Sequence, residues 1–274
     1  MIRLVRSEVL KYITTRTAWG LTIGMFVTGL GFSAIFGALF IYGSPIPGVE
    51  LSELAPPLLF ARFVYTSAIQ FGYVLALVIG VLCIGQEYRH HTITGTFLAT
   101  PKRSRVIGAK VIALCLIAAV SGAVHVIGSL IGGGILLGTA GLPVYPDAGE
   151  LTKTLVLMTL VLALWTLIGL GVGVLIPNQV AALVLAIAVA WIVEPLAGFG
   201  LSFVSWGQDI SRFFPSQVTA STLDVFTGAD DSLRAALNGP TDPLGWVAGA
   251  AVLLCYAAVM ALIGLLLTRS RDIA

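Results

Sequence analysis

The chain has 274 residues, of which 58% are hydrophobic and 10% charged, and its mean hydropathy is +1.01. Soluble domains carry about 25% charged residues, so this composition excludes a soluble globular protein. The formal net charge of +2 excludes little by itself. We therefore expect an all-α integral membrane protein that forms a single domain.

Residues 1–15 predict an amphipathic helix that lies in the membrane interface. On a helix, Ile2, Val9 and Ile13 share one face, while Arg3 and Lys11 lie on the other. The polar lead of about sixteen residues is too long for a signal peptide. A cytoplasmic extension of the first membrane span is the alternative interpretation.

Six apolar runs are each long enough for a membrane-spanning helix, which needs about 20 residues. The predicted spans cover residues 17–42, 63–85, 106–137, 155–176, 180–199 and 244–268. The third span is long enough to tilt, or to break at its three consecutive glycines. Between the last two spans lies an outer segment, 200–243. Its aromatic residues predict short amphipathic helices at the outer interface within 205–214 and 218–226.

The basic residues set the orientation, because cytoplasmic loops are enriched in Lys and Arg. With both termini in the cytoplasm, eleven of the fifteen basic residues lie on the inner side. The four on the outer side are Arg62, Lys153, Arg212 and Arg234. We therefore expect both termini to be cytoplasmic.

Several kinds of site have no pattern in the sequence. No lysine follows a glycine, so the chain has no P-loop for ATP. There is no HExxH motif, and the adjacent His90 and His91 point in different directions on a helix, so we expect no metal site. The three cysteines lie in apolar runs, where cysteine behaves as a small hydrophobic residue.

Three polar residues inside the spans are candidates for a transport pathway. His125 and Ser129 are four residues apart and share a helix face. Glu194 is the one acid within a span, and an intramembrane carboxylate is by default a functional hypothesis. The alternative is that Glu194 lies shallow enough to reach outer water. Beside His125, Gly128 and Gly132 form a GxxxG pair that permits close helix packing.

The stretch GQEYRHHTITGTFLATPKRSRVIGAK, residues 85–110, separates the second and third spans. The residue before Pro101 is pushed out of helical geometry, so a short cytoplasmic helix is expected to end near Thr100. Ile93 and Phe97 are apolar residues that a solvated loop would not need. They favour contact with lipid or with a partner protein.

This stretch resembles the first cytoplasmic loop of ABC-2 type transporter permeases. Bacterial members of that family show a G-x-E-x-R-x-G-T-I run, a short helix and a T-P-x-x-R turn. The matching residues are Glu87, Arg89, Thr92, Ile93, Thr100, Pro101, Arg105, Ala109 and Lys110. His91 departs from the pattern, because glycine is common there. The overall layout of the chain agrees with the family.

The resemblance implies a non-catalytic permease subunit in the bacterial plasma membrane. A second permease, the same or a related chain, and two ATP-binding subunits holding ATP and Mg would complete the transporter, with no cofactor in this chain and no nucleic acid. The implied docking residues of the coupling helix are Glu87, Arg89, Thr92, Ile93, Thr96, Phe97, Leu98, Thr100 and Pro101. In this interpretation Glu87 pairs with a nearby cation such as Arg89 or Arg105, and the helix at 1–15 braces the docking region.

An apolar pathway with few fixed charges favours export of an amphiphile, such as a lipid, a peptide antibiotic or a drug. Two alternatives stay open. A secondary transporter would need ionisable residues at the midplane, which most of the spans lack. An intramembrane enzyme would need His125 with Ser129, or Glu194, as catalytic groups. The substrate, the direction of transport and the pairing of permeases are open.

Overall fold

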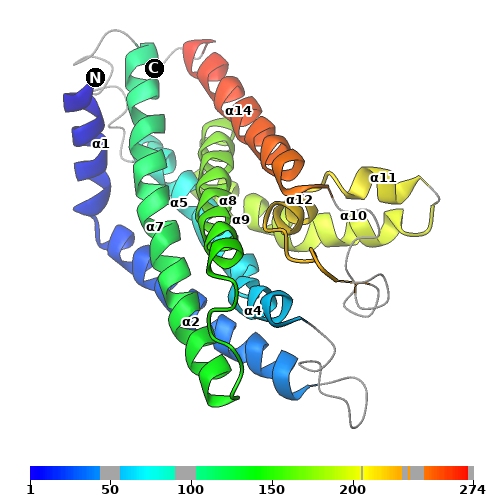
Figure 1. Ribbon diagram of the computed structural model, residues 1–274. Coiled ribbons are helices and arrows are strands. Elements are labelled where there is room, and N and C mark those ends of the chain that lie inside the picture. The colour runs from blue at the N-terminus through cyan, green and yellow to red at the C-terminus, as the bar shows by residue number, and fades with distance from the viewer. Residues whose placement is uncertain (44–55, 90–102, 205, 230–233, 235–243, 271–274) are drawn as a thin grey trace.

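The structure is a computed structural model, and it describes residues 1–43, 56–89, 103–204, 206–229, 234 and 244–270. Every regular element in these residues is a helix (Figure 1). The helices are α1 (Ile2–Ile13), α2 (Arg16–Tyr42), α4 (Pro57–Thr66), α5 (Ile69–Arg89), α7 (Arg103–Thr139), α8 (Ala148–Leu175), α9 (Gln179–Ala188), the π-helical turn η1 (Val189–Val193), α10 (Glu194–Leu201), α11 (Gly207–Ser211), α12 (Pro215–Thr222) and α14 (Trp246–Ser270).

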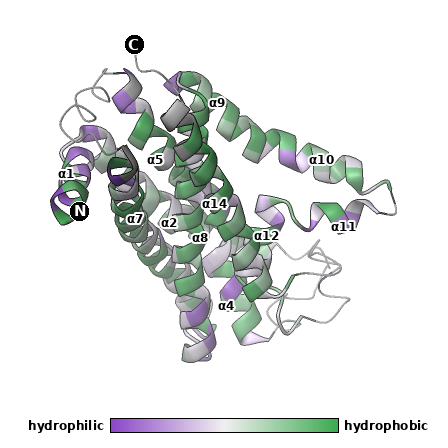
Figure 2. Cartoon of the chain, turned by 90° about the horizontal axis from the view of Figure 1, so that it is seen from above, coloured by the Kyte–Doolittle hydropathy of each residue, from purple (hydrophilic) through white to green (hydrophobic). Residues whose placement is uncertain are grey.

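Six helical segments in the described residues are long and apolar enough to cross a membrane, which confirms the predicted number of spans. They are Arg16–Tyr42, Pro57–Glu87, Gly108–Thr139, Ala148–Leu175, Gln179–Leu201 and Trp246–Ile263. Figure 2 shows these segments as mostly hydrophobic. The chain therefore fits a multi-pass membrane protein.

Polar caps explain where several of these helices begin. Thr15 caps α2 by accepting a hydrogen bond from the backbone N–H of Ala18, and Asn178 caps α9 in the same way. Asp147 caps α8, which begins seven residues earlier than the predicted span at 155. The hydropathy pattern missed this first part of α8 because it carries Glu150 and Lys153.

Glycine lets the central helices pack closely. A Cβ atom on Gly128 or Gly132 would overlap a carbonyl oxygen of α2, so the GxxxG pair forms the contact between α7 and α2. Gly80 and Gly169 do the same between α5 and α8. The three glycines at 132–134 do not break α7, which runs without interruption.

The predicted second span is two helices, α4 and α5, separated by a turn at Ser67 and Ala68. A break inside a membrane span leaves backbone carbonyls without helical partners, and they must be satisfied by other groups. Hydroxyl groups from the neighbouring helices do this. Ser33 donates to the carbonyl of Val64 (3.0 Å), and Ser129 donates to that of Tyr65 (2.5 Å).

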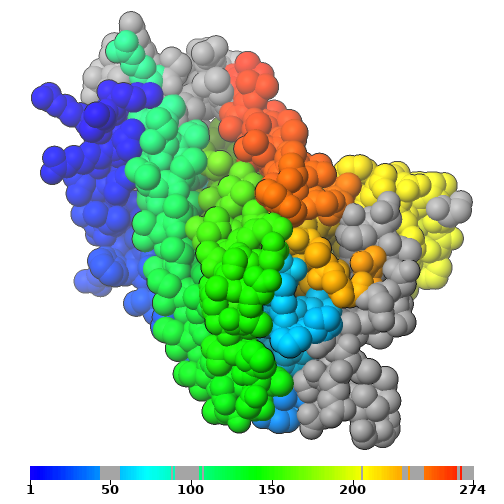
Figure 3. All heavy atoms as spheres, viewed as in Figure 1, coloured from blue at the N-terminus to red at the C-terminus, as the bar shows by residue number. Residues whose placement is uncertain are grey.

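The fifth span, α9 to α10, projects from the side of the bundle (Figures 1 and 3). Its first part packs on α5 and α8. Of its most apolar 18 residues, 22% are buried. The turn η1 interrupts the α-helix, since the backbone N–H of Glu194 bonds the carbonyl of Val189, five residues back. This turn sets the direction in which Glu194 points.

The helix α12 lies inside the bundle, against α8 and α14. Val218 and Leu223 are completely buried, and the indole N–H of Trp165 donates to the Thr219 hydroxyl at 2.9 Å. The predicted position of 218–226 at the outer interface stays a prediction. The aromatic and aliphatic residues of this segment cover neighbouring helices within the protein.

The predicted N-terminal helix is present as α1, which packs mainly along α7 (Figure 3). Its only buried residue is the charged Glu8, whereas Ile2, Leu10 and Ile13 are exposed. The helix therefore turns a charged group toward the bundle. Its position at a membrane surface stays a prediction.

Candidate functional site

Two groups of charged residues lie at opposite ends of the bundle, and an aromatic cavity lies between α2, α5 and α12. We call the first group the α1-end cluster; it consists of Glu8, Lys11, Glu87 and Lys110. The second is the α4-end cluster, which consists of Arg62, Glu150, Lys153 and Asp224.

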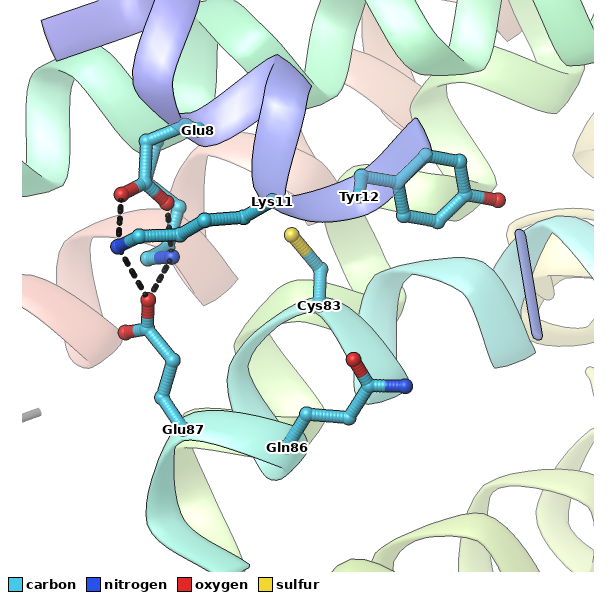
Figure 4. Close-up of a pocket in the computed structure, with 7 residues that line it drawn as sticks. Glu8, Lys11, Tyr12, Cys83, Gln86 and Glu87 are labelled. Carbon is cyan, nitrogen blue, oxygen red and sulfur yellow. Dashed lines mark hydrogen bonds and ion pairs between the residues drawn. The ribbon is translucent and has the colours of Figure 1, made fainter. Parts of the chain in front are cut away.

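The α1-end cluster is a closed ring of alternating charges (Figure 4). The Lys11 ammonium lies 2.6 Å from Glu8 and 3.0 Å from Glu87. The Lys110 ammonium bonds the other oxygen of Glu8 and lies 3.0 Å from Glu87. Each lysine therefore bridges both carboxylates, and the formal charges cancel. The ring joins α1 to the end of α5 and the start of α7.

Burial alone would raise the pKa of the Glu8 carboxyl, but the charges and hydrogen bonds of Lys110 and Lys11 outweigh it. The pKa of Glu8 therefore lies below its ordinary value of 4.5. Burial would likewise lower the pKa of Lys11, but Glu8 and Glu87 raise it above 10.5. Both groups are therefore charged at neutral pH.

A cavity of about 300 Å³ adjoins this ring and is also lined by Tyr12, Cys83 and Gln86. Figure 4 shows the Tyr12 hydroxyl pointing away from the ring. Burial, with a smaller contribution from Cys83, raises the pKa of Tyr12 to about 12, so its hydroxyl stays protonated.

The structure corrects the ion-pair partners predicted for Glu87. Glu87 pairs with Lys11 and Lys110, not with Arg89 or Arg105, and both arginines are exposed. Arg89 is two residues after Glu87 on a helix and so cannot share its face. The sequence did not indicate that Lys11 pairs with Glu87, because Lys11 lies 76 residues away on α1.

The other residues predicted for the coupling helix lie outside the described residues, and their docking role stays a prediction. They are Thr92, Ile93, Thr96, Phe97, Leu98, Thr100 and Pro101. The α1-end cluster contains residues from both helices that flank this segment.

His125 and Ser129 pack between helices. The Nδ1 atom of His125 lies 2.9 Å from the Met25 carbonyl oxygen, which assigns the proton to Nδ1. Its Nε2 has no hydrogen-bond partner within the described part of the chain and faces Gly72, where a Cβ atom would lie 2.7 Å away. Ser129 donates to Tyr65 on α4, so its hydroxyl is engaged by a backbone carbonyl.

Glu194 is buried and caps another helix. Its Oε1 accepts a hydrogen bond of 2.6 Å from the backbone N–H of Ser216, in the first turn of α12. The exposed N–H groups and the dipole of a helix N-terminus favour a carboxylate. The sequence could not indicate this contact, because the two residues are 22 positions apart.

The aromatic cavity, which we call the phenylalanine cavity, has a volume of about 320 Å³. Its aromatic lining residues are Phe36, Phe40, Phe63, Tyr73 and Phe226. Its polar lining residues are Thr66, Ser67, Gln70, Ser216 and Thr219. Ligand sites are typically apolar cavities with a few polar groups of this kind. Neither His125 nor Ser129 lines it.

The α4-end cluster holds the segment that closes one side of this cavity. Arg62, which is 1% exposed, donates to the Glu150 carboxylate at 2.7 Å, to the Thr154 hydroxyl at 3.1 Å and to the Asp224 carbonyl at 3.3 Å. Lys153 bridges Glu150 (3.5 Å) and Asp224 (3.2 Å). Because Asp224 follows α12, the cluster attaches this segment to α4 and α8.

No protein-family model matches this chain, and no curated protein sequence matches it.

Proposed function

We propose that this chain is the permease subunit of an ATP-driven transporter, resembling the ABC-2 type, and that it exports an amphiphilic substrate across a bacterial plasma membrane. Both termini lie in the cytoplasm in this proposal. ATP and Mg are bound by two separate ATP-binding subunits, and a second permease completes the membrane pathway. The permease has no catalytic role.

The observation that carries the proposal is the α1-end cluster. It ties α1 to the ends of α5 and α7, which flank the segment 90–102 that contains the expected coupling helix. A force applied to that segment by a partner would reach three helices together, because each charge is bonded to two others. Such a frame is what a coupling helix needs in order to move membrane helices.

The phenylalanine cavity supports an amphiphile as the substrate. Aromatic side chains form much of its wall, and five polar side chains provide a few hydrogen-bonding groups. Two of its walls come from α5 and α12, and both helices also contact α8. Movement of α5 would therefore change the shape of the cavity.

The test is purification of the chain from native membranes in mild detergent, followed by assay of ATP hydrolysis. We expect an ATP-hydrolysing partner to co-purify. Its loss is expected when Phe97→Asp and Leu98→Asp are introduced together. The matched control places Val144→Asp and Tyr145→Asp in the loop at the opposite end of the bundle, where both residues are exposed and association should persist.

A secondary transporter is the alternative. The break between α4 and α5 could hold a coupling ion if its carbonyls were free, but Ser33 and Ser129 occupy those of Val64 and Tyr65. Transport driven by a proton or sodium gradient in ATP-free vesicles, with the purified chain alone, would contradict the proposal. Hydrolytic activity of the purified chain that is lost in His125→Ala would instead support an enzyme.

A further inference from the structure

Five charged residues are buried in the described part of the chain: Glu8, Arg62, Glu87, Lys110 and Glu194. The first four each form an ion pair. Glu194 has no ion-pair partner among the described residues; its Oε1 bonds a backbone N–H. The N-terminus of α12 stabilises this carboxylate, but no opposite formal charge in the described residues neutralises it.

The carboxylate lies directly behind the wall of the phenylalanine cavity. It accepts a hydrogen bond from the backbone N–H of Ser216, and Ser216 lines the cavity. None of the described residues that line the cavity carries a formal charge. Asp224 lies between the lining residues Leu223 and Val225 but is paired with Lys153, so Glu194 is the negative charge beside the cavity that has no ion-pair partner among the described residues.

The aromatic walls have the same electrostatic preference. The face of an aromatic ring is negative and attracts cations. Phe63 stands at the centre of the aromatic wall, since its ring centroid lies 5.0 Å from that of Phe40 and 5.2 Å from that of Phe226. A cation inside the cavity would be attracted both by these rings and by Glu194.

We propose that the phenylalanine cavity binds the cationic end of an amphiphile, with Glu194 as its counter-charge. The cavity is at the small end of the range for ligand pockets, so it accommodates a substituted ammonium or aromatic ammonium group and not a whole lipid. Gln70 lines the cavity and is exposed, which leaves a side for the apolar remainder to extend out of the bundle. An anionic end would meet the like charge of Glu194.

This assignment names the substrate class of the proposed transporter. It rests on the proposed function only in calling the bound cation a transport substrate. Binding needs no ATP-binding partner. A failure to bind cations would therefore overturn the substrate class and leave the permease proposal standing. A failure to co-purify an ATP-hydrolysing partner would do the reverse.

The experiment uses the full chain in lipid nanodiscs and three probes of matched shape. They are benzyltrimethylammonium, its uncharged isostere neopentylbenzene, and the anion phenylmethanesulfonate. Equilibrium dialysis against empty nanodiscs corrects for partition into lipid. We expect the cation to bind roughly tenfold more tightly than the uncharged probe, and the anion more weakly than both.

Glu194→Gln keeps an oxygen that can accept from Ser216 and removes the charge. In this variant the preference for the cation is expected to disappear, while the uncharged probe binds as before. Asp209→Asn is the matched control, because it makes the same change in charge at an exposed carboxylate in α11. It should leave all three affinities unchanged.

Phe63→Leu is a second variant that does not depend on the α12 cap. It keeps an apolar side chain and removes the ring, so cation binding should fall about three- to tenfold with little change for the uncharged probe. Equal binding of the cation and its uncharged isostere by the native chain would overturn the proposal. So would an undiminished preference for the cation in Glu194→Gln.

Discussion

The α1-end and α4-end clusters each contain two acids and two bases, but they are built differently. The α1-end cluster is a ring in which every charge has two partners, and only Lys11 is exposed. The α4-end cluster is a chain of three ion pairs, and only Arg62 is buried. In the α4-end cluster, water can replace a lost partner at Glu150 or Lys153. In the ring, most losses leave a buried charge.

The comparison indicates different uses. The ring fixes three helix ends relative to one another, so its stabilisation belongs to the whole bundle. The α4-end cluster fixes the segment that closes the phenylalanine cavity. Loss of its ion pairs should therefore destabilise that segment and not the whole bundle. Substitutions in the two clusters, and a change of pH, test this difference.

The largest effect is expected for Lys110→Met. The side chain of Lys110 is 7% exposed, and the loss of its ammonium leaves Glu8 and Glu87 buried with one lysine between them. Breaking a buried pair on one side typically costs about 3–5 kcal/mol. The free energy of unfolding in mixed detergent micelles measures the loss.

Lys11→Met is the matched control, because Lys11 makes the same two contacts but its side chain is 46% exposed. We expect a loss of about 1 kcal/mol or less. Equal losses in the two variants would show that the number of ion pairs, and not burial, determines the stability of the ring.

Arg62→Met should have the next largest effect. It leaves the Asp224 carbonyl without its donor and removes one partner of Thr154, at a cost of about 2 kcal/mol. Hydrogen exchange should quicken at the amides of 215–222 and stay slow in α7. Lys153→Gln, which changes a more exposed residue, should have a smaller effect at the same amides. Uniformly faster exchange across the bundle would contradict a local role.

Acid should weaken the ring through Glu8. Because the pKa of Glu8 is lowered in the folded protein, its contribution is complete above about pH 4.5 and is lost as the pH falls through the lowered pKa. The free energy of unfolding should decrease in this range. In Glu8→Gln this part of the acid dependence should be absent. Lys11, whose pKa is raised, contributes below pH 10.5 and loses its contribution above it.

The smallest effect is expected for Asp224→Asn. Asp224 has a φ of 55°, a left-handed conformation that asparagine also tolerates, and Lys153 keeps its contact with Glu150. The loss should be about 0.5 kcal/mol. Asp224→Ala should cost about 1 kcal/mol more, because alanine is poorly suited to this conformation. A thermal unfolding comparison of the two variants separates the charge from the backbone.

Features that repeat along the sequence were predictable. The six apolar runs predicted the spans, and the GxxxG pair at Gly128 and Gly132 predicted a close helix contact, whose partner in the structure is α2. The break at Ser67 and Ala68 had no such signal, because neither residue is a strong helix breaker. It depends on hydroxyl groups of Ser33 and Ser129, which come from two other helices.

The candidate sites were harder to predict because they join distant segments. Glu87 was recognised as an anchoring residue from the family pattern, but its partners come from α1 and from the start of α7. Glu194 was recognised as a carboxylate within a span, but Ser216 lies beyond α11. Periodicity gives the face on which a residue lies, not the helix that this face meets.

The π-helical turn at 189–193 has a consequence for insertions and deletions. A π turn holds one more residue than an α turn, and each residue added to a helix rotates the remainder of that helix by about 100°. Because the π turn absorbs its extra residue, deleting one residue within it would restore a regular α-helix in which Glu194 still faces Ser216, whereas deleting one residue from the α-helical part before it would swing Glu194 away. The residues of the turn itself are apolar, so their exchange for one another would leave the rotation intact. The direction of this carboxylate therefore depends on the number of residues in α9, while the turn itself tolerates the loss of one residue.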